Sequence, residues 1–133
     1  MSQPSINPVA KTLYLCDGHI GFPGQKTDLV GLFGAIRPAH YPHVQKHFVI
    51  FAQLISGLGQ VPFYIDIRYA GDGSLIHSTL PSSLQFPHRD KLVHMACTIQ
   101  GCLFPHPGRY LVELPCNGQW VAEATLELQD QSD

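Results

Sequence analysis

Three histidines stand close together in the segment AHYPHVQKHF, and their spacing raises the question of a metal site. On a helix, His40, His43 and His47 would share one face, and three neutral imidazoles with an open position for water make a catalytic zinc site. Pro38 and Pro42 interrupt the segment, however, and a proline pushes the residue before it into extended geometry. We therefore expect a loop without a bound metal. The alternative is a metal-dependent enzyme or metal-binding protein that uses these histidines.

Other arrangements that support catalysis are weak in this sequence. There is no Gly-x-Ser-x-Gly segment, so the strained turn that exposes a catalytic serine is not predicted. The four cysteines, Cys16, Cys97, Cys102 and Cys116, include no Cys-x-x-Cys pair, and we expect them to be buried and reduced. The sequence therefore predicts a protein that is not an enzyme and that needs no cofactor.

The balance of charges argues against nucleic acid and membranes as partners. Eight Lys and Arg against ten Asp and Glu give a formal charge of −2, and the basic residues are scattered, whereas phosphate binding needs clustered cations. No stretch approaches the roughly 18 apolar residues of a transmembrane helix. The N-terminal MSQPSINPVAK lacks the basic start and apolar run of a signal peptide, so we expect a cytoplasmic protein.

One clear strand pattern lies in the middle of the chain. In FYIDIRYA, residues 63–70, apolar and polar side chains alternate with the period of two that a half-buried strand requires. Asp66 and Arg68 share the outward side, which indicates a solvated ion pair rather than an acid–base dyad. The GDG turn that follows predicts a hairpin with a returning strand at 74–80.

The strongest hairpin pattern lies near the C-terminus. Strands are predicted at 109–114 and 119–129, and Asn117-Gly118 between them favours the two positive-φ positions of a type I′ turn. Simple alternation places these residues of the second strand on one face: Trp120, Ala122, Ala124, Leu126 and Leu128.

Weaker strand patterns complete an all-β prediction. They lie at 11–17, 28–36, 46–55 and 91–100, and the third of these is apolar on both faces. About eight short strands with Gly and Pro turns predict a two-layer antiparallel β-sandwich of immunoglobulin-like topology.

The chain length of 133 residues suits one domain. We expect a flexible N-terminal arm at 1–10, a single β-sandwich domain at 11–129 and a C-terminal tail at 130–133.

The order of these motifs resembles a family of small bacterial proteins classified as a domain of unknown function. Its members begin with an apolar strand that ends in Cys-Asp, continue with a Lys and a Leu-x-Gly-x-Phe-x-x-Ile strand, and close with a Pro-Gly-x-Tyr hairpin. The resemblance spans residues 11–129 and implies a β-sandwich without implying an activity. Here the pattern falls on Cys16, Asp17, Lys26, Leu29, Gly31, Phe33, Ile36, Pro107, Gly108 and Tyr110.

Three of these positions also have a structural interpretation. Asp17 precedes a glycine and is expected to accept hydrogen bonds from turn amides. Gly31 within a strand indicates a bulge or close packing of the opposite sheet. Tyr110 is expected to place its ring in the core.

Two apolar runs favour an interaction over catalysis. FVIFAQLI and LVGLF exceed what one sandwich face consumes, so we expect a binding or assembly module. Its partner would be a protein or a second copy, bound through an edge strand or an apolar sheet face as a homodimer. A carbohydrate- or peptide-binding sandwich is a further alternative, and its ligand-binding candidates are Tyr41, Phe86 and Phe104, with Trp120 nearby.

Overall fold

The computed structural model describes residues 4–24 and 26–130, and within them the chain forms eleven β-strands. The first sheet has the order β2-β1-β4-β9, and its strands are β1 (Val9–Phe22), β2 (Lys26–Phe33), β4 (His43–Ile55) and β9 (Val93–Phe104). The second sheet has the order β3-β11-β10-β5-β8, with β6 and β7 attached through β10. Its strands are β3 (Ala35–Ile36), β5 (Gly59–Phe63), β6 (Asp66–Tyr69), β7 (Leu75–Ser78), β8 (Ser82–Phe86), β10 (Gly108–Cys116) and β11 (Gln119–Leu128).

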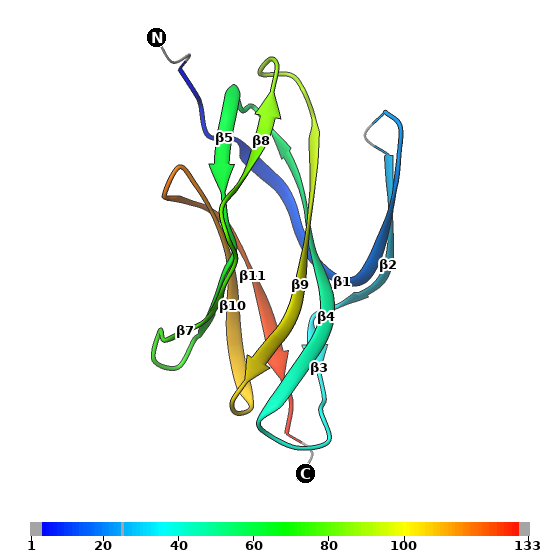
Figure 1. Ribbon diagram of the computed structural model, residues 1–133, viewed down its shortest axis with the longest axis vertical. Helices are drawn as coiled ribbons and strands as arrows, with labels where there is room; N and C mark the ends of the chain where they lie inside the picture. Colours follow the sequence, from blue (N-terminus) through cyan, green and yellow to red (C-terminus); the bar gives the residue numbers. More distant parts are fainter. Residues whose placement is uncertain (1–3, 25, 131–133) are drawn as a thin grey trace.

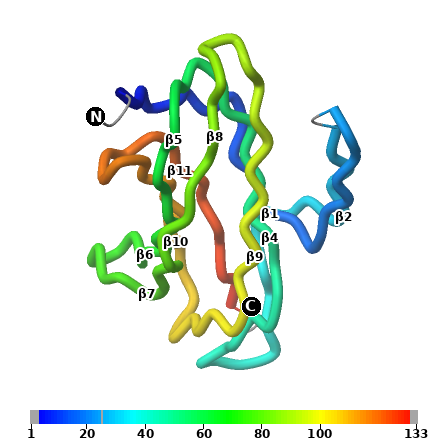
Figure 2. Tube along the Cα trace, turned by 45° about the horizontal axis from the view of Figure 1, so that its top comes forward, coloured from blue at the N-terminus to red at the C-terminus, as the bar shows by residue number. Residues whose placement is uncertain are grey.

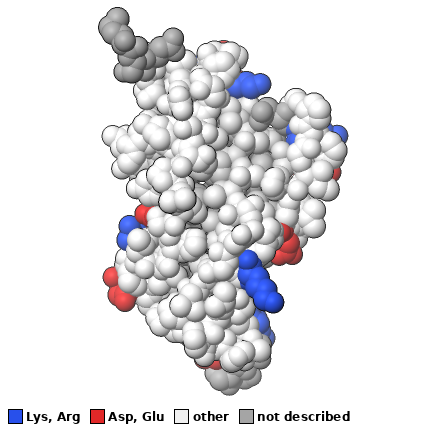
Figure 3. Space-filling model, in the orientation of Figure 1, with Lys and Arg blue, Asp and Glu red and all other residues white. Residues whose placement is uncertain are grey.

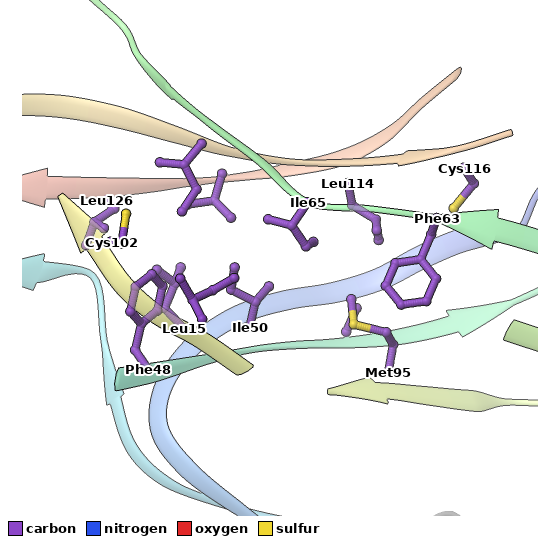
Figure 4. Packing of buried hydrophobic residues seen from close by; sticks show 14 of the residues in the cluster. Leu15, Phe48, Ile50, Phe63, Ile65, Met95, Cys102, Leu114, Cys116 and Leu126 are labelled. Carbon is purple, nitrogen blue, oxygen red and sulfur yellow. The ribbon is translucent and has the colours of Figure 1, made fainter. Parts of the chain in front are cut away.

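The two sheets face each other and enclose one hydrophobic core (Figure 1). Alternating residues of β4 point into it, and their side chains have no exposed surface or nearly none. Opposite them lie the inward residues of β10, of which Tyr110 is the largest (Figure 4 shows part of this packing). Burial of this apolar surface is the main favourable term in folding. The core residues of these two strands are Phe48, Ile50, Ala52, Leu54, Tyr110, Val112, Leu114 and Cys116.

The prediction of an all-β fold is confirmed, but the expected number of about eight strands is wrong. The single strand expected at 63–70 is divided between β5 and β6, and the strand expected at 28–36 is divided between β2 and β3. The strand β8 has no counterpart among the predictions, because the segment SSLQF is short and polar. Eleven strands therefore replace eight within the described residues, and all pair antiparallel except β3 with β11.

The C-terminal hairpin forms at the predicted turn. Asn117 has a φ of 52° and Gly118 a φ of 72°, which are the positive values of a type I′ turn. Gly118 adopts this conformation without a steric penalty, and Asn tolerates it better than most residues. The prediction of this turn is confirmed.

The distal part of β1 and β2 forms a second feature, which we name the outer hairpin and define as the described residues 18–24 and 26–30. It lies on the side of the first sheet that faces away from the second sheet (Figures 1 and 2). Thr27 Oγ1 lies 2.9 Å from His94 Nδ1 of β9 and ties the hairpin to that face. The N-terminal half of β1 lies in the sheet, so one strand serves both structures.

The segment before β1 also contacts the body of the protein. Ile6 and Leu58 exchange backbone hydrogen bonds of 2.9 and 3.1 Å, and Asn7 Nδ2 donates to the carbonyl of Cys116 at 3.0 Å. The first three residues of the expected N-terminal arm lie outside the described residues, as do 131–133 of the expected tail. Within residues 4–24 and 26–130, no helix is long and apolar enough to cross a membrane.

Candidate functional site

The three clustered histidines do not come together. His43 is the first residue of β4 and His47 lies four residues further along the same strand, while His40 is exposed in the preceding turn. A strand rises about 3.3 Å per residue, so His43 and His47 are separated by roughly 13 Å. His43 Nε2 lies 2.8 Å from Gln45 Oε1, which occupies one ring nitrogen. In the described part of the chain, no three His, Cys, Asp or Glu residues are grouped to hold a metal ion.

The cysteines offer no reactive thiol. In the described residues they form no disulfide, and Cys16, Cys102 and Cys116 are buried, while Cys97 is partly buried. Burial raises the pKa of Cys102 to about 12 and that of Cys116 to about 11, because a thiolate loses its hydration there. The thiol form therefore dominates at neutral pH, and these side chains act as small apolar residues.

The aromatic residues proposed for ligand binding are mostly committed to the core. Phe86 and Phe104 have no exposed surface, and the ring of Phe104 packs edge-on against Tyr110 at 5.0 Å. Tyr41 is partly buried, and its hydroxyl donates to the carbonyl of Gln129 at 2.7 Å. The fourth aromatic, Trp120, is 61% exposed and lines a surface cavity.

That cavity lies on the outer face of the second sheet and has a volume of about 260 Å³. It is lined by Tyr64, Asp66, Arg68, Glu113, Pro115 and Trp120. We call it the Trp120 pocket. It combines aromatic side chains with fixed hydrogen-bonding groups of both signs, as small-molecule sites commonly do.

The Trp120 pocket contains a connected ion-pair network. Arg68 Nε donates to Glu113 Oε1 at 2.9 Å, and Arg68 Nη2 donates to Asp66 Oδ2 at 3.4 Å. The other oxygen of Asp66 accepts from Ser78 Oγ at 2.6 Å. The alternation of the sequence predicts a solvated pair of Asp66 and Arg68, but Asp66 is only 8% exposed and Arg68 also bonds to Glu113. The ion pair is therefore partly buried on the outer face of the sheet, where side chains of β6, β7 and β10 contact one another.

Carboxylates form a row across this part of the sheet. Asp66 of β6 lies opposite Glu113 of β10, and Glu113 lies opposite Glu123 of β11. Like charges directly opposite one another destabilise a sheet, so the row needs its compensating donors. Arg68 donates hydrogen bonds to Asp66 and Glu113. For the third carboxylate, Trp120 Nε1 lies 3.3 Å from Glu123 Oε1. The donors fix the orientation of the side chains around the pocket.

Trp120 reaches this face through an irregularity that alternation does not predict. The β10–β11 register shifts between Leu114 and Pro115, so Leu114 pairs with Ala122 while Pro115 pairs with Trp120. The extra residue of this bulge, Val121, places Gln119 and Trp120 on the faces opposite to those that simple alternation gives. The prediction that Trp120 shares the face of Ala122 is therefore wrong. A β-branched residue within a regular strand carries no sequence signal for such a bulge.

A larger hollow of about 650 Å³ lies beside the C-terminal end of β11. Its described lining includes Arg37, Pro107, Glu127 and Asp130 but no aromatic side chain. We therefore base the candidate ligand site on the Trp120 pocket.

The outer hairpin forms a different kind of surface. In its register, Gly18 is opposite Val30, Ile20 opposite Asp28 and Phe22 opposite Lys26, so these side chains share one face. The other face carries Thr27, which reaches His94. Ile20, Phe22 and Val30 are 51%, 42% and 51% exposed, so the apolar face is turned to solvent.

The inward face of the outer hairpin covers part of the first sheet. Val49 and Phe51 point away from the inter-sheet core, yet they are only 2% and 4% exposed. The ring of Phe51 packs edge-on against His94 at 5.1 Å, next to the Thr27 hydrogen bond. This arrangement explains why β4 is apolar on both faces: one face meets the second sheet and the other lies beneath the outer hairpin.

The fold and the site define an all-β domain with two facing sheets, a surface pocket at Trp120 and an apolar hairpin. The chain belongs to the family of unknown function DUF6941, whose model matches residues 11–129. The resemblance inferred from the sequence motifs is thereby confirmed. A search of curated proteins finds no match.

Among solved structures, one similar chain is the Pseudomonas fluorescens alkylpurine DNA glycosylase AlkC bound to DNA containing an abasic site analog. The similarity has a TM-score of 0.51 at 17% sequence identity, and it covers 72% of this chain and 27% of the glycosylase. The chain therefore matches about a quarter of that enzyme's length. At this level of identity the similarity extends to the fold alone.

Proposed function

We propose that this domain is a non-catalytic assembly module that binds a second copy of the chain through the outer hairpin. The observation that carries the proposal is one apolar face of the outer hairpin. It is formed by Ile20, Phe22 and Val30, which lie on the same side of two paired strands and are exposed to solvent. Exposed apolar surface of this kind is typical of a protein interface.

The edge of the hairpin supports the same partner. In the described residues β2 pairs with β1 and ends the first sheet, so its other side has free backbone donors and acceptors. If two copies of β2 pair antiparallel about Thr27, Lys26 of one copy lies opposite Asp28 of the other. The two ion pairs that result make the edge self-complementary, as a two-fold interface requires.

The distribution of charge favours a protein partner over nucleic acid. Lys and Arg side chains are scattered over the face shown in Figure 3 and form no continuous patch there. Binding to the DNA backbone depends on clustered cations. For the architecture, we retain the immunoglobulin-like sandwich as a proposal, supported by the two facing sheets of mostly antiparallel strands.

Light scattering on the eluting protein tests the proposal. The wild type is expected to shift from monomer to dimer as its concentration rises. The double variant Ile20→Lys/Val30→Lys places two charges on the apolar face and is expected to stay monomeric with an unchanged circular dichroism spectrum. The control Leu80→Lys changes an equally apolar residue that is 89% exposed in the β7–β8 loop and should dimerise normally. A wild type that is monomeric at every concentration, or a double variant that still dimerises, would refute this function.

A further inference from the structure

The Trp120 pocket has no role in the assembly proposed above, because it lies on the second sheet and the outer hairpin lies over the first. We propose that this pocket binds a neutral saccharide, with the sugar ring stacked on the indole of Trp120 and its hydroxyl groups bonded to Arg68, Asp66 and Glu113.

The indole offers an exposed and oriented platform. Trp120 is 61% exposed, and its Nε1 lies 3.3 Å from Glu123 Oε1, so the ring is held by its polar edge and not by burial. The electron-rich face of an aromatic ring attracts groups that carry a partial positive charge. The C–H bonds on one face of a pyranose ring are such groups, and they are also apolar enough to gain from leaving water.

The hydrogen-bonding groups beside the indole are already in place. Arg68 donates to Glu113, to Asp66 and to the carbonyl of Gly73, which uses three of its five N–H groups. The side chain is 38% exposed, so its remaining donors are accessible to a ligand. Groups that are fixed before binding lose little conformational entropy when a ligand arrives.

The mixture of charges selects a neutral ligand. The lining carboxylates of Asp66 and Glu113 repel phosphate and other anions, while the guanidinium of Arg68 lies between them and opposes a cation. Adjacent hydroxyl groups of a sugar both donate and accept, so they can bond to a carboxylate and a guanidinium at once. A cavity of about 260 Å³ is close to the lower end for ligand pockets, which suits one sugar ring with its neighbour in solvent.

Intrinsic fluorescence tests the proposal directly, because Trp120 is the chain's one tryptophan. The purified wild-type protein is titrated with glucose, galactose, N-acetylglucosamine, maltose, cellobiose and lactose. At least one of these is expected to change the emission saturably, with a millimolar or tighter Kd, and to protect Trp120 from quenching by acrylamide. Tetramethylammonium and inorganic phosphate are the charged probes, and neither is expected to compete.

Two variants separate binding from folding. Glu113→Gln keeps the shape of the side chain and should weaken the sugar about tenfold, since it removes a charged acceptor. Glu127→Gln changes an exposed carboxylate of β11 outside the pocket and should leave the Kd unchanged. Trp120→Leu should abolish the binding heat in calorimetry while the unfolding transition is retained.

Three results would overturn the saccharide assignment: no saturable response to any sugar, a response to tetramethylammonium alone, or equal weakening by Glu113→Gln and Glu127→Gln. None of them bears on dimerisation, which light scattering measures separately.

Discussion

Asp17 of β1 lies opposite Gly31 of β2, and its carboxylate occupies the space that a side chain at residue 31 would need. Gly31 also has a φ of 69°, in the left-handed region that favours glycine. The expectation that Asp17 accepts hydrogen bonds in a turn is wrong, because Asp17 lies within β1. The close approach expected at Gly31 is present, but the neighbour is Asp17 on the adjacent strand rather than the opposite sheet. The two residues stand at the base of the outer hairpin.

Gly31→Ala is therefore expected to destabilise the protein by about 2–4 kcal/mol. The left-handed backbone accounts for roughly 1–2 kcal/mol, and the overlap of the new Cβ with the Asp17 carboxylate adds the rest. Urea unfolding followed by circular dichroism measures the change.

Gly34→Ala is the matched control, because a Cβ at Gly34 meets no atom within 4 Å. It should cost less than about 0.5 kcal/mol. Adding Asp17→Ala to Gly31→Ala removes the overlap with the carboxylate. The double variant should therefore recover the stability lost to the overlap and keep only the loss that comes from the left-handed backbone. Equal effects of the two alanine substitutions would contradict the role of this pair.

The core was predictable from the sequence because it follows a simple rule. Tyr110, Val112 and Leu114 alternate with outward residues of the predicted strand at 109–114, and all three are buried. The type I′ turn was predictable for the same reason, since its local sequence determines its φ values.

The candidate sites were not predictable because each depends on a departure from regular pairing. The bulge at Val121 rotates Trp120 onto the outer face, and nothing in the alternation of β11 marks it. Likewise, the excess apolar surface of FVIFAQLI was expected to meet a partner, whereas its outward residues Val49 and Phe51 are buried and residues 18–24 and 26–30 of the same chain cover part of that face. Long-range placement of this kind is set by tertiary packing rather than by local propensity.

Removing the bond between Thr27 and His94 should loosen the outer hairpin. Thr27→Val keeps the shape of the side chain but loses the 2.9 Å contact. Cys16 points to the outer face of β1 and is buried near the base of the hairpin. Its alkylation by iodoacetamide, followed by peptide mass spectrometry, should therefore speed up about twofold to tenfold, the range that one hydrogen bond allows.

The control for Thr27→Val is Thr125→Val, an exposed threonine on β11 of the other sheet, which should not change the rate. Cys102 lies in the inter-sheet core and reports on global opening. If the alkylation of Cys102 and of Cys16 speeds up equally, the substitution has lowered the stability of the whole protein. The Thr27 hydrogen bond then does not hold the hairpin in particular.

The hydroxyl of Tyr110 is expected to contribute to stability. The ring is fully buried, and the hydroxyl donates to the carbonyl of His106 at 2.6 Å. Tyr110→Phe leaves that carbonyl without its donor and should cost about 1–3 kcal/mol in urea unfolding. Tyr14→Phe, at a residue that is 44% exposed, should change stability by less than about 0.5 kcal/mol. A similar cost for both variants would show that the buried hydrogen bond has no special weight.

His94 should make stability depend on pH. Burial lowers the pKa of His94 below its ordinary value of 6.5, because the imidazolium loses hydration beneath the outer hairpin. The folded state therefore binds a proton less readily than the unfolded state. The contribution of His94 is complete above pH 6.5 and is lost as the pH falls toward the lowered pKa.

The neighbours of His94 explain which proton is involved. Gln53 Nε2 lies 3.2 Å from His94 Nε2 and can only donate, so the neutral ring carries its proton on Nδ1, toward Thr27. Protonation of Nε2 would place two donors against each other and force the amide of Gln53 to turn. An NMR titration of the His94 ring should therefore give a pKa below its ordinary value of 6.5. When the pH is lowered from about 7.5 to 5, the free energy of unfolding measured in urea should fall less for His94→Gln than for the wild type. A His94 pKa equal to or above 6.5 would contradict the burial of this ring beneath the hairpin.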